Sequence, residues 1–415
     1  MNRIVRWKRT LATLALAGWA AMGAAAEPGW MGLSLDEALA RALDNHPLLA
    51  EAEARSEAAA GRTRQAGLWP NPELTVGAEQ LRSDPDLVDT RESVAGLSQQ
   101  IPLGGRAGKA REVARLEQEA ARHEREVVRR EVERRVRGAF ATALFQQEAL
   151  KILDQGMEDH GQAMSFARAR LQAGELVPVD IAASEMAGAR LSLERDRCRE
   201  ATRLAREALA LAMGEPERVP EALAGDLDAS CDVPALEDLL RHMDQHPEAL
   251  REAAAVGGAL ARLALAKAAR IPDVEVGVLF RRLEATNEER LDLGVNLPLP
   301  MFDRGQGQVA EARAEARAAG LRQRLVLQER RQSLREDHQR LREAMASYQA
   351  HMDVLVPQAE RTLHAAEARA AVGDLNHVDL LETRLEVMRV RLDRLEALRG
   401  LMQAWADLSP HTVRG

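Results

Sequence analysis

The chain contains two copies of one sequence pattern, about 200 residues apart, and this repeat restricts the possible folds more than any other feature. Four segments of the first half return in the same order in the second half, at offsets between 196 and 202 positions. The matched segments are Asn45-His46-Pro47 with Gln245-His246-Pro247, Trp69-Pro70-Asn71-Pro72-Glu73 with Ile271-Pro272-Asp273-Val274-Glu275, Ile101-Pro102-Leu103 with Leu297-Pro298-Leu299, and Ala173-Gly174-Glu175-Leu176 with Val372-Gly373-Asp374-Leu375. Such ordered recurrence indicates an internal two-fold repeat.

Each copy is predicted to hold a helix, two strands, one very long helix, a tight turn and a shorter return helix. The first copy spans residues 27–215, with strands at about 73–80 and 92–101, a long helix at about 106–172 and a return helix at about 177–213. The second copy spans residues 216–415, with strands at about 273–283 and 290–298, a long helix at about 305–371 and a return helix at about 377–408. The predicted fold class is mainly α with a small β part.

Apolar residues recur every seventh position in the long helices, which is the seam of a coiled coil. The first seam is Val136, Ala143, Leu150, Met157, Met164 and Leu171, and the second is Leu327, Leu334, Leu341, Tyr348 and Leu355. No proline occurs from Arg106 to Leu171, and a helix of that length spans about 100 Å. A rod or a tube accommodates such a helix, whereas a compact globular domain does not. Pro357 should kink the second long helix.

The four strand segments alternate apolar and polar residues, most clearly in Val274, Val276, Val278 and Phe280 and in Leu291, Leu293 and Val295. This period fits membrane strands with one face to lipid and one to water, although each segment alone also fits an ordinary half-buried strand. Four strands cannot close a barrel, because the smallest membrane barrels have about eight. Three chains would supply twelve. An aromatic content of 3% counts against a membrane barrel, which usually carries aromatic girdles.

The N-terminus has the order of a secretory signal peptide, predicted at residues 1–26: basic residues, an apolar run from Leu11 to Ala21, then Ala24-Ala25-Ala26. A membrane anchor is the alternative interpretation. Cys198 and Cys231 are the only cysteines, so one optional disulfide is possible in an oxidising compartment and a disulfide-built fold is not. The net charge of −8 argues against nucleic acid as a partner.

The sequence resembles the TolC-like outer-membrane efflux family. The resemblance covers nearly the whole exported chain and is carried by Ser34-Leu35-Asp36-Glu37-Ala38-Leu39, Asn45-His46-Pro47, the run from Gln65 to Glu73, Gln100-Ile101-Pro102-Leu103-Gly104-Gly105, and the two helix turns. The run from Gln65 to Glu73 is most similar to the cobalt–zinc–cadmium (CzcC-like) branch. The resemblance implies a homotrimer in the outer membrane of a Gram-negative bacterium, with a twelve-stranded barrel, contacts to outer-membrane lipid and a large periplasmic helical tunnel.

The same resemblance implies a passive duct in a tripartite pump. Its partners would be a periplasmic adaptor and an inner-membrane transporter of the resistance–nodulation–division type, and its cargo heavy-metal cations. Drug efflux and type I polypeptide secretion remain alternatives, since a wide tunnel discriminates cargo poorly. A soluble periplasmic coiled-coil scaffold is the alternative from another class.

The resemblance also implies an acidic constriction at the periplasmic tip, and the matching residues here are Asp180, Asp379 and Glu382. Acids at a helix start also complement the helix dipole, which is the alternative explanation. Gly174 and Gly373, with Leu176 and Leu375, are predicted to form the helix turns and the adaptor contact. Ala370 and Leu375 occupy the positions where some relatives have a Tyr and Arg latch.

No catalytic residue, cofactor or metal site is predicted. The segment from Gly104 to Ala110 lacks the spacing and the Ser or Thr of a phosphate loop. His242 and His246 have the helical spacing of zinc ligands, but no third ligand has comparable spacing. A capped, partly exposed histidine pair is the expected arrangement there. The Met residues along the seams are interpreted as packing residues.

Overall fold

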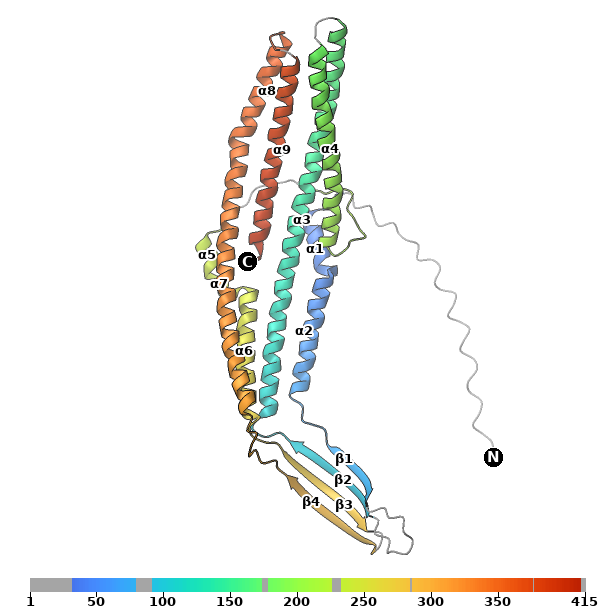
Figure 1. The fold of residues 1–415 in the computed structure, drawn as a ribbon, viewed down its shortest axis with the longest axis vertical. Coiled ribbons are helices and arrows are strands. Elements are labelled where there is room, and N and C mark those ends of the chain that lie inside the picture. Colours follow the sequence, from blue (N-terminus) through green and yellow to red (C-terminus); the bar gives the residue numbers. More distant parts are fainter. Residues whose placement is uncertain are drawn as a thin grey trace, which may run out of the picture.

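The computed structural model describes residues 32–79, 92–173, 178–225, 233–283, 286–375 and 377–411. A long bundle of helices carries a small four-stranded sheet at one end and two helical hairpins at the other (Figure 1). This arrangement confirms the predicted class, mainly α with a small β part. The predicted signal peptide, residues 1–26, lies outside the described residues.

The elements follow the order of the repeat. The first half contains α1 (Leu35–Asn45), α2 (Pro47–Ala66), β1 (Glu73–Glu79), β2 (Glu92–Ile101), α3 (Arg106–Gln172) and α4 (Pro178–Ala212). The second half contains α5 (Leu236–Arg241), a 3₁₀ turn (Met243–Gln245), α6 (Pro247–Ala268), β3 (Val274–Leu283), β4 (Glu288–Asn296), α7 (Gln306–Ala350), a π-helical turn (His351–Leu355), α8 (Val356–Ala371), α9 (His377–Leu408) and a final 3₁₀ turn (Ser409–His411).

The repeated histidines perform the same local task in both halves. His46 and His246 have extended backbones, and their Nδ1 atoms accept hydrogen bonds from the backbone N–H of Leu48 (3.1 Å) and Glu248 (3.4 Å). Proline occupies the first helical position in both cases, where its missing N–H costs nothing. The motif therefore starts α2 and α6 in the same way, because one side chain satisfies an otherwise unpaired helix donor.

The core is divided between the two halves. One cluster joins α1, α3 and α4 and includes Val132, Val136, Phe140, Leu144 and Leu209. Another joins α7 and α9 and includes Leu334, Leu341, Leu398, Leu401 and Leu408. A third cluster, around Leu153 of α3, Leu191 of α4 and Met388 of α9, holds the two halves together toward the hairpins. The seam positions of the first long helix are buried or half-buried throughout.

The second long helix departs from the predicted continuous helix over 305–371. Its α-helical hydrogen bonding changes to a π-helical turn at His351–Leu355, two residues before Pro357. Proline has no N–H for the carbonyl four residues earlier, and a π turn absorbs one extra residue. The predicted seam residue Leu355 is the last residue of this turn, and it is 45% exposed. The seam prediction is wrong at this position.

The sheet has the order β1-β2-β3-β4, and all its pairs are antiparallel. The alternation of Val, Leu and Phe with polar residues or glycine favours this pleated arrangement. Rows of paired residues run across the strands, for example Leu74, Leu97, Val278 and Leu293. The face opposite this row carries Gly77, Gly96, Gly277 and Gly294.

Candidate functional site: the sheet and the helical tips

One face of the sheet is apolar and exposed on all four strands. Its large side chains are between 40% and 78% exposed: Leu74, Val76, Leu97, Val276, Val278, Phe280, Leu291, Leu293 and Val295. A monomeric soluble protein rarely exposes so large a contiguous apolar patch. This face therefore requires an apolar partner.

The opposite face of the sheet suits contact with water. Arg281 of β3 bridges two neighbouring strands on this face, with Nε 2.9 Å from Asp292 Oδ2 and Nη1 3.2 Å from Glu92 Oε2. Glycines and polar residues such as Ser98 and Asn296 occupy much of the rest. One apolar and one polar face is the pattern of a strand that separates lipid from water.

Both edges of the sheet are open in the described part of the chain. β1 pairs only with β2, and β4 pairs only with β3. Each edge presents unpaired N–H and C=O groups, and such groups cost several kcal/mol each in hydrocarbon. The edges must therefore pair with strands of another chain if the apolar face meets lipid. None of the described helices is long and apolar enough to cross a membrane.

Asp273 fastens the sheet to the long helix. Its carboxylate accepts hydrogen bonds from Gln100 Nε2 (3.0 Å), from the backbone N–H of Leu103 (3.3 Å) and from Arg106 Nη1 (2.6 Å). These donors come from the end of β2 and the start of α3, whereas Asp273 precedes β3. Two of the four junctions between helices and strands, α6–β3 and β2–α3, are thus joined through one carboxylate, which couples the orientation of the sheet to that of α3.

The turn between α8 and α9 has the geometry that its glycine predicts. Gly373 has φ +78°, its N–H donates to the carbonyl of Ala370 (3.1 Å), and the N–H of Asp374 donates to that of Arg369 (2.9 Å). Arg369 Nε also lies 2.9 Å from Asp374 Oδ2. A positive φ favours glycine at this helix end, because other residues are strained there. Leu375 follows and is half-buried.

The described acids of the second tip lie where the sequence predicts. Asp379 and Glu382 are exposed, three residues apart near the start of α9, which places them on one helix face. Asp180 falls near the start of α4, but its side chain lies outside the described structure, as do Gly174 and Leu176 entirely. The ring of acids, the first turn and the adaptor contact therefore stay predictions.

Sequence reasoning missed a pair of salt bridges with exchanged charges. Arg168 Nη2 of α3 lies 2.9 Å from Glu185 Oε1 of α4, and Arg384 Nη2 of α9 lies 3.0 Å from Glu367 Oε1 of α8. The offset of 199 positions between the two turns relates Arg168 to Glu367 and Glu185 to Arg384. Each hairpin thus has a salt bridge at the matching position. The basic residue lies on the long helix α3 in the first hairpin and on the return helix α9 in the second. These salt bridges could have been predicted from the sequence, because the charges at the matched repeat positions are reversed.

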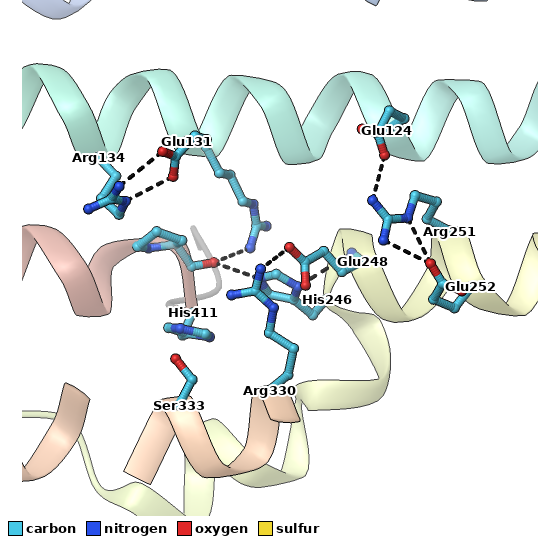
Figure 2. A network of polar contacts seen from close by, with 12 residues as sticks. Glu124, Glu131, Arg134, His246, Glu248, Arg251, Glu252, Arg330, Ser333 and His411 are labelled. Atoms are coloured by element: carbon cyan, nitrogen blue, oxygen red, sulfur yellow. Dashed lines mark hydrogen bonds and ion pairs between the residues drawn. The ribbon is translucent and has the colours of Figure 1, made fainter. Parts of the chain in front are cut away.

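A polar joint connects the first half of the chain to the end of the second. The carbonyl of Pro410 accepts from Arg130 of α3 and from His246 Nε2 (3.1 Å), while Arg330 of α7 pairs with Glu248 of α6 (Figure 2). Arg251 of α6 reaches Glu124 of α3 at 2.7 Å in the same network. The joint therefore fixes the C-terminal turn against α3, α6 and α7.

The two histidines of the predicted pair have separate roles. His242 ends α5, and its Nδ1 donates to the carbonyl of Asp238 (2.8 Å). His246 caps α6 and is only 8% exposed, so the expectation of a partly exposed pair is wrong for this residue. The chain breaks its helix between them, which removes the spacing that zinc ligands need. Within the described ranges no group of three or more His, Cys, Asp or Glu side chains is placed to hold a metal ion.

The joint should weaken in acid through His246. Burial, the neighbouring His411 and the charge of Arg130 lower the pKa of His246 to about 3 from 6.5. Because the folded-state pKa is depressed, the associated stability is complete above pH 6.5 and is lost as the pH falls toward 3. The loss should reach about 3 kcal/mol at pH 4. His246→Asn keeps a capping oxygen but removes the titration, so its urea-unfolding free energy should change less over this pH range. A wild-type slope equal to that of the variant would contradict the assignment.

Comparison with known proteins identifies related sequences and folds. The family model described as "Outer membrane efflux protein" matches residues 38–215 and 241–410. The cobalt-zinc-cadmium resistance protein CzcC of Cupriavidus metallidurans is 28% identical over 375 residues, which cover 90% of this chain and 88% of that protein.

Solved structures share the fold at low sequence identity. The CmeC outer membrane channel of Campylobacter jejuni superposes with a TM-score of 0.77 at 15% identity, covering 91% of this chain and 85% of that one. The open state of the MtrE outer membrane channel of Neisseria gonorrhoeae gives a TM-score of 0.75 at 17% identity, covering 91% and 88%. The helical bundle and the sheet are therefore arranged here as in outer-membrane channels.

Proposed function

This chain belongs to the outer membrane efflux protein family, and on that premise we propose that three copies form an outer-membrane duct that exports heavy-metal cations. The observation that carries the proposal is the four-stranded sheet, whose exposed apolar face and open edges require lipid and further strands. Three copies supply twelve strands, which is enough to close a membrane barrel. A soluble periplasmic scaffold would leave this face in water, which disfavours that alternative.

The internal repeat indicates how the copies pack. Leu385 and Leu392 of α9 lie in the cluster around Leu153 of α3, so the return helix of the second half packs on the long helix of the first. The 199-position offset of the two turns relates these leucines to Met186 and Leu193 of α4. Those two side chains are 60% and 53% exposed. Repeat symmetry therefore leaves α4 without the equivalent partner within its own chain.

The missing partner of α4 is the second long helix of a neighbouring copy. The offset that relates α9 to α4 also relates Leu153 to Met352, and Met352 is exposed in the single chain. Packing Met186 and Leu193 of one copy near Met352 of the next reproduces between chains the contact seen within a chain. The same operation repeated around an axis closes a ring of long helices, which is the wall of a duct.

Cross-linking tests this packing. In a background with Cys198 and Cys231 replaced by Ser, the pair Met186→Cys and Met352→Cys should give disulfide-linked ladders that end at trimers on non-reducing gels. Disulfides need Cα atoms within about 7 Å, so the pair Met186→Cys and Glu343→Cys, placed about 14 Å further along the helix, should give almost none. Ladders that pass beyond trimers, or equal yields from both pairs, would contradict the trimer and its register.

The proposed partners of the duct follow from the position of the helical tips, at the end of the molecule opposite the sheet (Figure 1). We place the tips around Gly373 against a periplasmic adaptor, and through it the duct serves an inner-membrane transporter of the resistance–nodulation–division type. The similarity to CzcC supports metal cations as cargo.

In a strain that lacks the gene, zinc, cobalt and cadmium should inhibit growth at lower concentrations, and expression of the chain should reverse this. Sensitivity to drugs without sensitivity to metals would overturn the cargo assignment. The family is one of transport proteins, and no catalytic role is proposed.

A further inference from the structure

Six arginines form one straight row along the outside of α7. They recur at intervals of four, seven, seven, four and seven residues. On a helix with 3.6 residues per turn, these positions fall within about 40° of one another and extend over about 43 Å. All six side chains are exposed, and we call them the arginine row: Arg313, Arg317, Arg324, Arg331, Arg335 and Arg342.

The arginine row is not neutralised by acids of its own helix. The exposed acids of α7 lie on a different side, about 140° away around the helix: Glu311, Glu315, Glu329, Glu336 and Glu343. On α3, by contrast, Arg115 lies 2.8 Å from Glu112 and 3.2 Å from Glu119. Among the described residues, the row makes one ion pair, between Arg331 and Asp244 at 4.0 Å. A protein with a net charge of −8 thus carries a concentrated basic surface, which attracts a polyanion.

The arginine row faces away from the duct interior. A groove runs from the polar face of the sheet, at Ser98 and Asn296, past Asp273 and along α6. α7 contributes Glu311 and Glu315 to this groove. The polar face of the sheet meets water inside a barrel, so the groove and the acids of α7 face the interior. The row lies on the opposite side of the same helix and therefore faces outward.

A neighbouring copy does not neutralise the arginine row. α3 packs between α2 and α6, so the repeat predicts that α7 packs between α6 and the α2 of the next copy. α2 carries three acids and three arginines. Its Glu51 pairs with Arg55 at 2.5 Å, and its Glu53 pairs with Arg125 at 2.7 Å. The row therefore keeps a net positive charge in the trimer.

The position of the arginine row indicates which polyanion it meets. α7 begins beside the sheet and extends away from it along α6 (Figure 1). At 1.5 Å per residue from Gln306, Arg313 lies about 10 Å and Arg342 about 54 Å along the helix. With the sheet in the outer membrane, the row lies in the periplasm. The polymer that a duct crosses there is the peptidoglycan wall, whose stem peptides carry free carboxylates. Arginine binds carboxylates through two parallel hydrogen bonds.

We propose that the arginine row binds the carboxylates of peptidoglycan stem peptides on the outer surface of the duct. This inference rests on the proposed membrane duct and adds the cell wall to its partners. Three rows, one on each copy, run along the duct and cross the thickness of the wall. They hold the duct in an opening of the wall mesh.

Cosedimentation with isolated peptidoglycan sacculi tests the proposal. Trimers in mild detergent should sediment with the sacculi at low salt. The triple variant Arg317→Gln, Arg324→Gln and Arg335→Gln removes three members of the row. An arginine beside an anionic surface strengthens binding about fivefold, so the dissociation constant of this variant should rise by about 100-fold or more.

The matched control removes the same charge elsewhere. Arg115, Arg203 and Arg389 are exposed, and each pairs with a glutamate of its own helix. Their replacement by Gln should leave binding to sacculi at the wild-type level. Equal losses from the two triple variants would show that only total charge matters, and the inference would fail.

Two treatments identify the chemistry of the contact. Sacculi whose carboxylates have been converted to amides should not bind the trimers. Salt at about 1 M, where the Debye length is about 3 Å, should release bound trimers. Undiminished binding to the amidated sacculi would overturn the carboxylate assignment.

The remaining outcomes separate this inference from the duct itself. If the trimers conduct in planar bilayers but do not sediment with sacculi, the wall is not the partner and the inference fails. If the row variant no longer forms trimers, its arginines join the copies, and the inference fails as well. If the wild-type protein neither inserts nor conducts, the proposed function fails and the inference fails with it.

Discussion

Replacing Leu293 by arginine should abolish insertion into membranes. Leu293 is the most exposed side chain of the apolar face, at 78%, and it closes the row that begins at Leu74. An arginine on a lipid-facing strand near the bilayer centre costs about 2–4 kcal/mol, so three copies would lose about 10 kcal/mol together. Membrane flotation should show the variant in the soluble or aggregated fraction, without the trimer band on mild detergent gels.

Asn296→Arg is the matched control for Leu293→Arg. Asn296 belongs to the same strand but to the polar face, where it pairs with Glu275 across the sheet. Arginine there faces water and an acid, so insertion and trimer formation should be retained. Insertion of Leu293→Arg at wild-type levels, or failure of both variants alike, would show that the apolar face does not meet lipid.

Removing the acids of the second tip should remove most of the cation preference of the closed duct. Asp379→Ala with Glu382→Ala deletes the two exposed carboxylates that share one face of α9. In a trimer, carboxylates near the axis repel one another, which favours the binding of cations among them. In planar bilayers the wild-type trimer should pass small cation-selective currents that divalent ions block from the tip side. The variant should lose both properties and still form trimers.

Glu343→Ala serves as the control for the tip acids. Glu343 is an exposed acid on α7, distant from the turn, and salt screens such a scattered charge within about 10 Å. Its removal should leave selectivity and block unchanged. If the double variant keeps its divalent block, Asp379 and Glu382 serve only to complement the dipole at the start of α9.

Helices with unbroken periodicity could be predicted closely, and so could β2 and β3, whereas β4 is displaced by two residues. α3 runs from Arg106 to Gln172, as its seam and its lack of proline indicate. β4 ends at Asn296, two residues before the predicted end at 298. The alternation at Leu297 and Leu299 reports which face a side chain takes, whereas a strand also needs hydrogen bonds from a neighbour. Periodicity alone cannot distinguish a paired strand from an extended segment beyond it.

The remaining differences come from interactions that a periodic pattern does not encode. The π turn at His351–Leu355 depends on how the backbone accommodates Pro357, and its last residue, Leu355, is exposed where the seam predicts burial. The capping role of His246 depends on a break between α5 and α6. At the tip, by contrast, Gly373 could be assigned to the turn between α8 and α9 from the sequence. A tight turn between two antiparallel helices favours a positive φ, which glycine adopts most easily.

The exchanged salt bridges of the two hairpins should favour the native helix pairs over exchanged ones during folding. α9 already packs on α3 around Leu153, but with similar seams it could also take the place of α4 against the tip of α3, and α4 could take the place of α9 against α8. Such mispairing would place Arg168 against Arg384 and Glu367 against Glu185, two repulsive pairs in place of two attractive ones. Each exposed pair is worth at most about 1 kcal/mol. Across the six hairpins of a trimer, however, attraction and repulsion add in the same direction, so the duplicated chain carries a built-in means of telling its two halves apart.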